Sequence, residues 1–417
     1  MKRLLYIYLY CNLGGVATVI KQRLKYLNKE EYEVNLLFYK DLGGKQEWEK
    51  LGIPINIINE NNKIKETLKF IQNNHYDVIT IFDTPEVYNP IKNIFTGKLI
   101  YEMHSALEIT LNKLPVKTVN NLDMVIVPSD YQKSLVADKC NINKNIIKII
   151  PNIVNNSLFK YRTVNKKTQK KIIGWVGKLD QIKNWKEALK VFKELKEKRN
   201  DITFKFVSGS FVDEYTTYEL LNLLNKYNLM KDFLWIHDLS YEKMPEFYSM
   251  IAESRGVLLN SSKYESFCMI LHEAMRCNVP VVSSNIGPIP EYIKNGENGF
   301  LYDLGNINKA VSKIEKLLDD DLLYNKFIEN SHKVLKKYKP SAIIDKYKEL
   351  LKNTKNFPQL KIACIFDEFT YECFKPEFNI VAVTPSNWKN ILSKTPVDFL
   401  FVESAWKGNK SAWQFKI

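Results

Sequence analysis

The chain has 417 residues, a hydrophobic content of 45% and a net charge of +14. This length suits two or three domains rather than one, and the hydrophobic content excludes a disordered or fibrous protein. No run of about 18 apolar residues occurs, so no transmembrane helix is expected. The apolar run after the basic start, up to Tyr10, continues into Cys11-Asn12-Leu13-Gly14-Gly15 rather than a signal-peptide cleavage site, and a first buried strand is predicted there.

Cysteine spacing and local charge further restrict the class of protein to which the chain can belong. Six cysteines are scattered without a C-x-x-C pair, which indicates neither a disulfide framework nor a zinc site and fits a reducing cytosol. Residues 160–199 hold about 14 basic and 4 acidic side chains. They predict either an anion-attracting patch or the solvated face of a lysine-rich helix. Nucleic-acid binding is disfavoured, because no helix-turn-helix, zinc finger or stacked aromatic motif accompanies the charge.

Residues 1–160 alternate β-rich runs with amphipathic segments, which predicts a doubly wound, parallel α/β domain. The expected strands are Leu4–Tyr10, Val34–Tyr39, Ile55–Ile58, Val78–Phe82, Lys98–Met103, Met124–Val127 and Ile146–Ile150. The expected helices include Val16–Leu27, Ile64–Ile71 and Tyr131–Ala137.

After a Lys-rich linker the pattern restarts, and residues 161–355 predict a second domain of the same class. Its expected strands are Ile172–Val176, Ile202–Val207, Phe233–Ile236, Gly256–Leu259 and Pro280–Ser283. Its expected helices are Lys186–Lys198, Tyr215–Tyr227, Met269–Arg276, Asn308–Leu317, Leu323–Lys336 and Ser341–Leu351, and residues 340–355 are expected to pack back on the first domain. Residues 356–417 predict three more strands, Lys361–Phe366, Ile380–Val383 and Phe399–Val402, as the start of a further α/β module.

Ligands of doubly wound sheets bind beyond the carboxyl ends of the strands. Two loops of the first domain lie there. Gly14 and Gly15 follow the first strand and would let the backbone approach a phosphate, or would form a tight turn only; they do not make the G-x-G-x-x-G pattern of a dinucleotide cofactor. His104 follows the strand Lys98–Met103, where it is either a structural or a functional side chain.

Two loops of the second domain complete the set. Lys178 and Lys183 follow the strand Ile172–Val176 and either pair with a diphosphate or form a solvated loop. Glu265 and Glu273 flank the start of the helix Met269–Arg276 and would lie about 12 Å apart along a helix. The helix N-terminus between them offers N–H groups to an anion.

At this point the residues resemble a known family. The run Glu265–Glu273, followed by Pro280-Val281-Val282, Gly287-Pro288-Ile289-Pro290-Glu291 and Asn295-Gly296-Glu297-Asn298-Gly299-Phe300-Leu301, resembles the signature of glycosyltransferase family 4. Val127-Pro128-Ser129 and Ile150–Val154 resemble its domain-crossover segments. The resemblance covers roughly residues 1–353.

The resemblance implies a GT-B fold, with two facing Rossmann-like domains and a cleft between them, and a retaining transfer from a nucleotide-sugar to a hydroxyl of a glycan or other acceptor. By position, it implies catalytic roles for Glu265, His104, Lys178 and Lys183. The donor would be held by Gly14, Gly15, Ser266, Phe267, Cys268, Met269 and Glu273.

The resemblance also implies no cofactor and no metal, because lysines and helix dipoles neutralise the departing diphosphate. Asp319-Asp320-Asp321 resembles a metal-binding cluster but is predicted to cap a helix. Two positions depart from the family: Lys178 stands where Arg is usual, and Cys268 replaces a common glycine of the phosphate loop. Phosphorolysis or sugar-phosphate synthesis on the same fold, and a non-catalytic carbohydrate-binding scaffold, are the alternative functions.

The tail has a resemblance of its own. Phe366-Asp367-Glu368-Phe369 and Phe401–Asn409 resemble the start of a spore-maturation-type glycosyltransferase module, so the chain is expected to be part of a longer enzyme. A cytoplasmic protein is expected, with Lys21, Arg23 and Lys25 on the first helix offering either a membrane contact or a solvated face. The oligomeric state stays open.

Overall fold

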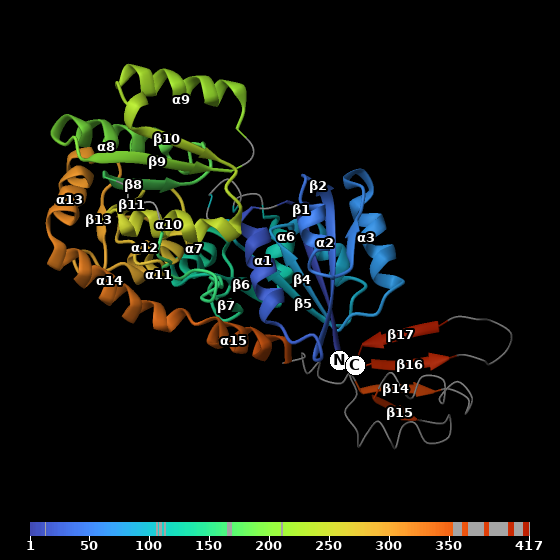
Figure 1. Ribbon diagram of the computed structural model, residues 1–417. Coiled ribbons are helices and arrows are strands. Elements are labelled where there is room, and N and C mark those ends of the chain that lie inside the picture. The colour runs from blue at the N-terminus through green and yellow to red at the C-terminus, as the bar shows by residue number, and fades with distance from the viewer. Residues whose placement is uncertain are drawn as a thin grey trace. The chain divides into compact units, whose positions relative to one another are not determined.

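The structure is a computed structural model that describes residues 1–12, 14–105, 107, 111, 114–164, 169–209 and 212–352, together with four strands of the tail. The chain divides into two compact units, Met1–Lys352 and Asn353–Ile417, and each is described by itself. The first unit contains two α/β domains, each with its own parallel sheet (Figure 1).

The first domain has a parallel sheet with the strand order β3-β2-β1-β4-β5-β6-β7. Its strands are β1 (Lys2–Cys11), β2 (Tyr32–Asp41), β3 (Ile55–Ile57), β4 (Val78–Phe82), β5 (Lys98–Glu102), β6 (Val125–Val127) and β7 (Ile147–Ile149). Its helices are α1 (Gly15–Tyr26), α2 (Lys45–Glu49), α3 (Lys63–Gln72), α4 (Tyr88–Lys92), α6 (Val116–Asn121) and α7 (Asp130–Cys140), with short 3₁₀ turns at Glu60–Asn62 and Pro85–Val87. Every residue of β4 and β5 is buried, because helices cover both faces of such a sheet.

The second domain repeats the architecture with the order β10-β9-β8-β11-β12-β13. Its strands are β8 (Lys171–Val176), β9 (Ile202–Ser208), β10 (Phe233–His237), β11 (Val257–Asn260), β12 (Val281–Ser284) and β13 (Phe300–Tyr302). Its helices are α8 (Trp185–Lys198), α9 (Glu214–Lys226), α10 (Met244–Glu253), α11 (Met269–Arg276), α12 (Ile289–Tyr292), α13 (Ile307–Asp319) and α14 (Asp321–Leu335), with 3₁₀ turns at Met230–Asp232, Tyr241–Lys243 and Lys336–Tyr338.

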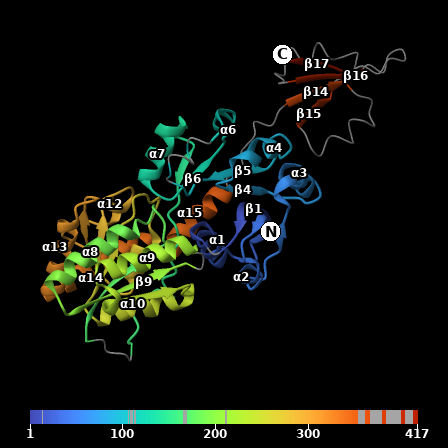
Figure 2. The same ribbon diagram turned by 90° about the horizontal axis from the view of Figure 1, so that it is seen from above.

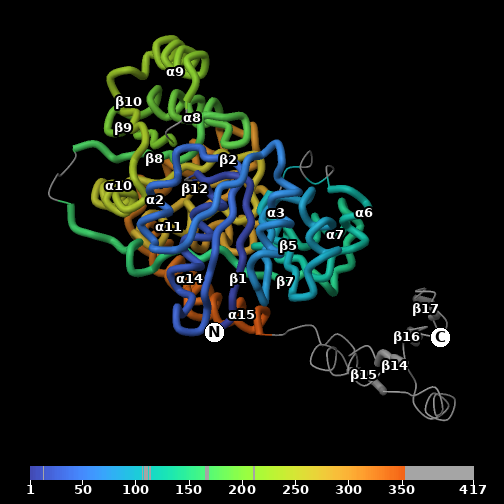
Figure 3. The backbone as a smooth tube through the Cα atoms, turned by 90° about the vertical axis from the view of Figure 1, so that its right-hand side faces the viewer, coloured from blue at the N-terminus to red at the C-terminus, as the bar shows by residue number. Residues whose placement is uncertain are grey.

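Helix α15 (Pro340–Lys352) follows the second domain but packs on the first (Figures 2 and 3). Its buried Ile343, Ile344 and Tyr347 belong to the same hydrophobic cluster as Leu4 of β1. The Tyr347 hydroxyl lies 2.8 Å from that of Tyr6. The chain therefore crosses between the two domains twice.

The predicted GT-B class, with two doubly wound domains, is confirmed by this topology. The predicted strands and helices are all present, with ends that differ by a few residues. In the second domain the sequence analysis did not predict β13 or α12, which have three and four residues, or α10, which begins at Met244 just before Pro245. Proline is favoured in the first turn of a helix, so Pro245 was the available signal for α10.

The basic segment 160–199 is largely paired. Most of its charged side chains in the described residues form ion pairs with carboxylates, several of them from other elements. These pairs are Lys170–Asp232, Lys186–Glu219, Lys196–Asp232, Lys198–Glu315 and Arg199–Asp319. This pairing favours the solvated helix face over a patch that attracts polyanions.

In the tail the structure describes β14 (Lys361–Ile365), β15 (Asn379–Ala382), β16 (Phe399–Glu403) and β17 (Ala412–Lys416), in the order β15-β14-β16-β17. Strand β17 pairs antiparallel to β16 and was not predicted. The motif Phe366–Phe369 and residues 404–409 lie outside the described residues, so the resemblance of the tail stays a prediction. Within the described ranges, none of the helices combines the length and apolarity needed to span a membrane.

Candidate functional site

The loop that contains Gly14 and Gly15 connects β1 to the N-terminus of α1. Gly14 is the N-cap of α1 and donates its N–H to Asn12 Oδ1 at 3.1 Å. A Cβ on Gly15 would meet no atom of the described chain within 4 Å, so packing within the protein does not require a glycine there. Leu13 lies outside the described residues. The first turn of α1 thus has room for a bound group beside its N–H donors.

His104 is held at the end of β5 by two carboxylates. Its ring Nε2 lies 2.9 Å from Glu102 Oε1, and its backbone N–H donates to Asp83 Oδ1 at 3.0 Å. Burial raises the pKa of Asp83, whose φ is +43°. The ring of His104 stacks on Phe82, with 6.1 Å between ring centroids. When Nε2 carries the hydrogen, its N–H donates a hydrogen bond to Glu102, and Nδ1 has no hydrogen-bond partner among the described residues.

Glu102 in turn is ionised by a partner from α1. Arg23 NH1 lies 2.5 Å from Glu102 Oε2, and Arg23 NH2 lies 2.7 Å from Oε1. Both side chains are buried, at 2% and 0% exposure. Burial raises the pKa of Glu102, but the charge of Arg23 and the hydrogen bond from His104 outweigh it and bring that pKa to about 2. His104 therefore rests on a fixed negative charge.

In the second domain, Glu265 lies before α11 and is paired with Lys183. Lys183 Nζ lies 2.5 Å from Glu265 Oε1, and Ser262 Oγ lies 2.8 Å from the same oxygen. The side chains of Lys183 and Glu265 are 25% and 10% exposed. The sequence analysis placed Lys183 and Glu265 in two separate loops, and the structure brings their side chains into direct contact. Lys178 is exposed, and its ammonium forms no ion pair within the described part of the chain.

The N-terminus of α11 carries an unusual residue. Cys268, the N-cap, has φ +64° and ψ +67°, a left-handed conformation that costs a non-glycine residue roughly 1–2 kcal/mol. Its side chain is buried, and burial raises the pKa of the thiol. Among the described residues, no protein acceptor receives the N–H groups of Phe267, Cys268 or Met269. These donors are available to an anion.

Glu273 lies on the second turn of α11, at 4% exposure. Its Oε2 accepts a hydrogen bond from the Tyr248 hydroxyl at 2.9 Å, and the structure shows no cation beside it in the described residues. Burial raises the pKa of Glu273 to about 7, against the smaller lowering effect of Tyr248. A carboxyl with this pKa can accept or donate a hydrogen bond near neutral pH.

The two domains meet at the first turn of α7. Ser129 Oγ donates to the Ser266 carbonyl oxygen at 2.8 Å, and Glu291 accepts the N–H groups of Asp130 and Tyr131 at 3.3 and 2.6 Å. Gln132 Nε2 donates to the Ser105 carbonyl oxygen at 2.6 Å. The loops of His104 and Glu265 are therefore linked through one helical turn.

Sequence reasoning did not identify Glu102, Tyr248, Ser129 or Glu291 as site residues. Glu102 gave a signal, since a charged residue in an otherwise apolar buried strand requires a partner. Ser129 gave another, as a serine before a helix is a common N-cap. However, Arg23, which pairs with Glu102, and Ser266, which accepts from Ser129, lie 79 and 137 residues away in the sequence.

The Asp319–Asp321 run has the predicted capping role. Asp320 is the N-cap of α14 and accepts the Leu323 N–H at 2.8 Å, while Asp319 pairs with Arg199 and Asp321 with Arg255. In the described ranges no three His, Cys, Asp or Glu side chains gather in a way that could hold a metal ion.

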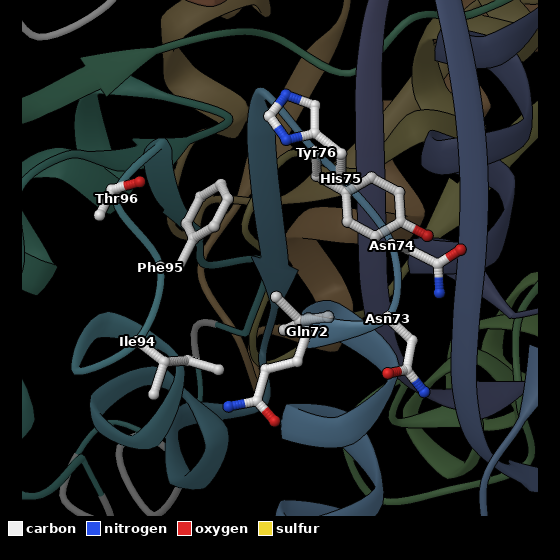
Figure 4. Close-up of a pocket in the computed structure, with 9 residues that line it drawn as sticks. Gln72, Asn73, Asn74, His75, Tyr76, Ile94, Phe95 and Thr96 are labelled. Atoms are coloured by element: carbon white, nitrogen blue, oxygen red, sulfur yellow. The ribbon is translucent and has the colours of Figure 1, made fainter. Parts of the chain in front are cut away.

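A pocket of about 300 Å³ lies elsewhere on the first domain (Figure 4). Its walls include Tyr76, which precedes β4, and Phe95, which precedes β5. It therefore lies at the amino ends of these strands, whereas Asp83 and His104 follow their carboxyl ends. The pocket is separate from the candidate site.

The comparisons with known proteins agree with this fold. Residues 159–334, which span most of the second domain, match the family model of Glycosyl transferases group 1. The chain is 30% identical over 172 residues to a sucrose synthase of Melioribacter roseus, covering 36% of this chain and only 22% of that protein. It is 25% identical over 362 residues to an uncharacterized glycosyltransferase of Haemophilus influenzae, covering 81% of this chain and 96% of that protein.

Among solved structures, HepE of Anabaena in complex with UDP and glucose has a TM-score of 0.73 and 17% identity, covering 84% of this chain and 99% of that one. This likeness shows that the two-domain GT-B fold is shared.

Proposed function

We propose that this chain, whose residues 159–334 match the family model of Glycosyl transferases group 1, is a retaining glycosyltransferase. It moves a sugar from a nucleoside-diphosphate donor to a hydroxyl of a glycan, a cell-surface polymer, a lipid or a protein-linked acceptor. The free thiols of the four described cysteines (Cys11, Cys140, Cys268 and Cys277) support a cytoplasmic location.

One arrangement carries this proposal. Among the described residues, the N-terminus of α11 offers N–H groups without a protein acceptor, with Glu265 and Lys183 before it and the buried Glu273 on its second turn. N–H groups at a helix start bind phosphate, and carboxylates accept hydrogen bonds from sugar hydroxyls. The arrangement fits a nucleotide-sugar whose diphosphate lies at the helix start and whose ribose reaches Glu273.

In the reaction, the bond between the anomeric carbon and the diphosphate oxygen breaks as the acceptor oxygen bonds to the same face of the sugar. Lys183, Lys178 and the α11 N–H groups stabilise the charge that develops on the diphosphate. The diphosphate takes the proton of the acceptor hydroxyl, so no protein base is needed. His104, whose ring is oriented by Glu102, would contact the donor sugar or the leaving phosphate.

UDP is the nucleotide we propose, since HepE is described in complex with UDP and glucose and with UDP-glucose. We further propose that no divalent metal takes part. Turnover should then be the same with EDTA as without it, and a rate that falls with EDTA and returns with Mg²⁺ or Mn²⁺ would contradict metal independence.

The test is release of nucleoside diphosphate from a panel of nucleotide-sugars without acceptor. One donor should be hydrolysed slowly, and Glu265→Gln should lower that rate by about 10²–10³. Glu246→Gln, a change at an exposed position of α10, is the control and should retain the rate. A panel that gives neither release nor a thermal shift would favour the non-catalytic scaffold and exclude the enzyme.

A further inference from the structure

We propose that Ser129, in the first domain, is a positioning residue for the donor diphosphate bound at the second domain. The inference rests on the glycosyltransferase function proposed above. It assigns to Ser129 the task of orienting the Phe267 N–H, without any contact between Ser129 and the donor.

The hydroxyl of Ser129 is used twice. It accepts the Gln132 N–H at 3.1 Å, which caps α7, and it donates to the Ser266 carbonyl oxygen at 2.8 Å. Ser129 is 3% exposed, so water does not compete for either bond. A serine that served only as a helix cap would not need to donate a hydrogen bond to the other domain.

The bond to Ser266 fixes a peptide plane. The C=O of Ser266 and the N–H of Phe267 belong to one planar trans peptide and point in opposite directions. A carbonyl held toward Ser129 therefore aims the Phe267 N–H away from the first domain's helix. The Tyr292 hydroxyl holds the Phe267 carbonyl at 3.0 Å and orients the Cys268 N–H in the same manner.

The turn that carries Ser129 is firmly docked. Glu291 of α12 accepts two N–H groups of this turn, and α7 lies beside α12 in Figures 1 and 2. A Cβ on Gly287 would lie 2.9 Å from the Glu265 carbonyl oxygen and 3.5 Å from the Tyr131 ring. The contact thus leaves no room for a side chain at position 287, and Ser129 is held at a fixed place opposite Ser266.

The same turn also reaches the loop of His104. Gln132 is fully buried, and its Nε2 donates to the Ser105 carbonyl oxygen at 2.6 Å. When α7 is docked, the diphosphate-binding N–H groups and the His104 loop are set with respect to one another. The diphosphate site is complete only when the first domain is in place.

The experiment compares the affinities of UDP and uridine by calorimetric titration, with uridine as a competitor. In Ser129→Ala the Kd for UDP should rise about tenfold, the effect of one lost hydrogen bond, while the Kd for uridine stays the same. Ser129→Thr keeps the hydroxyl and should restore UDP binding. The ratio of the two affinities isolates the diphosphate from the rest of the nucleotide.

The matched control is Asp213→Ala. Asp213 caps α9 by accepting the Thr216 N–H at 2.8 Å, so its loss destabilises a helix as Ser129→Ala does. It should lower the Tm without changing the ratio of UDP to uridine affinity.

Three outcomes would decide against the inference. Unchanged UDP binding in Ser129→Ala would overturn it, and equal weakening of UDP and uridine would show a merely structural role. If the unmodified protein bound neither UDP, GDP nor ADP, the proposed function would fail, and this inference with it. That last outcome is seen in the unmodified protein alone, so the two failures are distinguishable.

Discussion

Glu102 in the first domain and Glu273 in the second are both buried, yet they have opposite charge behaviour. The pKa of Glu102 falls to about 2, while that of Glu273 rises to about 7. Burial acts against the charged form of both. The difference is the partner: Glu102 pairs with the guanidinium of Arg23, whereas in the described part of the chain Glu273 is hydrogen-bonded to the neutral hydroxyl of Tyr248 and has no cation beside it. The first domain thus holds Glu102 with a permanent charge, and the second domain holds Glu273, whose charge changes near neutral pH.

The two residues therefore affect stability in opposite directions. Glu102, whose pKa is lowered, stabilises the fold at pH values above the ordinary glutamate pKa of 4.5. This contribution is lost as the pH falls toward 2. Glu273, with its pKa raised, binds a proton more tightly when folded. Its contribution is favourable below 4.5 and is lost as the pH rises to about 7.

The largest effect is expected where the fixed charge is removed. Glu102→Gln leaves Arg23 buried without its counter-charge and should lower the free energy of unfolding by about 3–5 kcal/mol. Urea denaturation at pH 7 measures it. The double change Arg23→Met with Glu102→Leu should recover much of the loss, and Glu47→Gln at an exposed ion pair should change nothing. A loss below about 1 kcal/mol would show that the pair is not a real buried charge pair.

For Glu273 the sign reverses. Glu273→Gln resembles the protonated acid, so at pH 8 it should raise the free energy of unfolding by roughly 3 kcal/mol, from a shift of the pKa from 4.5 to about 7. At pH 4 the gain should vanish. Thermal unfolding of both proteins between pH 4 and 8 tests this, with Glu246→Gln as the control. A gain independent of pH would contradict the raised pKa.

Tyr248→Phe sharpens the comparison at lower cost. The change removes the hydrogen bond that partly stabilises ionised Glu273, so the pKa of Glu273 should move further upward and stability at pH 8 should fall by about 1–2 kcal/mol. The midpoint of the pH dependence of Tm reports the pKa. If that midpoint stays in place while the protein is destabilised, the tyrosine acts through packing alone.

The smallest effect concerns an exposed position. Lys178→Arg replaces a single ammonium by a guanidinium that can contact a phosphate twice, so the Kd for UDP should fall by about two- to fivefold. Titration with UDP measures it, and Lys186→Arg on the solvent face of α8 is the control. Equal changes in both variants would point to net charge rather than to a contact.

Much of the fold was predictable because the strands and helices are determined by local sequence patterns. The run Val78–Phe82 gave a strand with the observed bounds, and Met269–Arg276 gave the observed α11, which placed Glu265 before the helix and Glu273 within it. Apolar runs and turn residues carry such information without reference to the rest of the chain.

The partners in the site were not predictable in this way. Arg23 and Glu102 are 79 residues apart, and Ser129 and Ser266 are 137 apart. Their pairing follows from strand order and from the docking of α7, which no local pattern encodes. The contact between Lys183 and Glu265 was missed for the same reason, although both residues were named.

The return of α15 to the first domain has a consequence for the order of synthesis. Arg23 is covered by the ring of Tyr347, whose centroid lies 4.2 Å from its guanidinium. During synthesis on the ribosome, the first domain therefore cannot complete its packing around Arg23 until residue 347 has emerged. At roughly 5–20 residues per second, the interval after residue 150 is on the order of 10–40 s. During that time the charges beneath His104 lack their cover, so the domain that begins first is completed last.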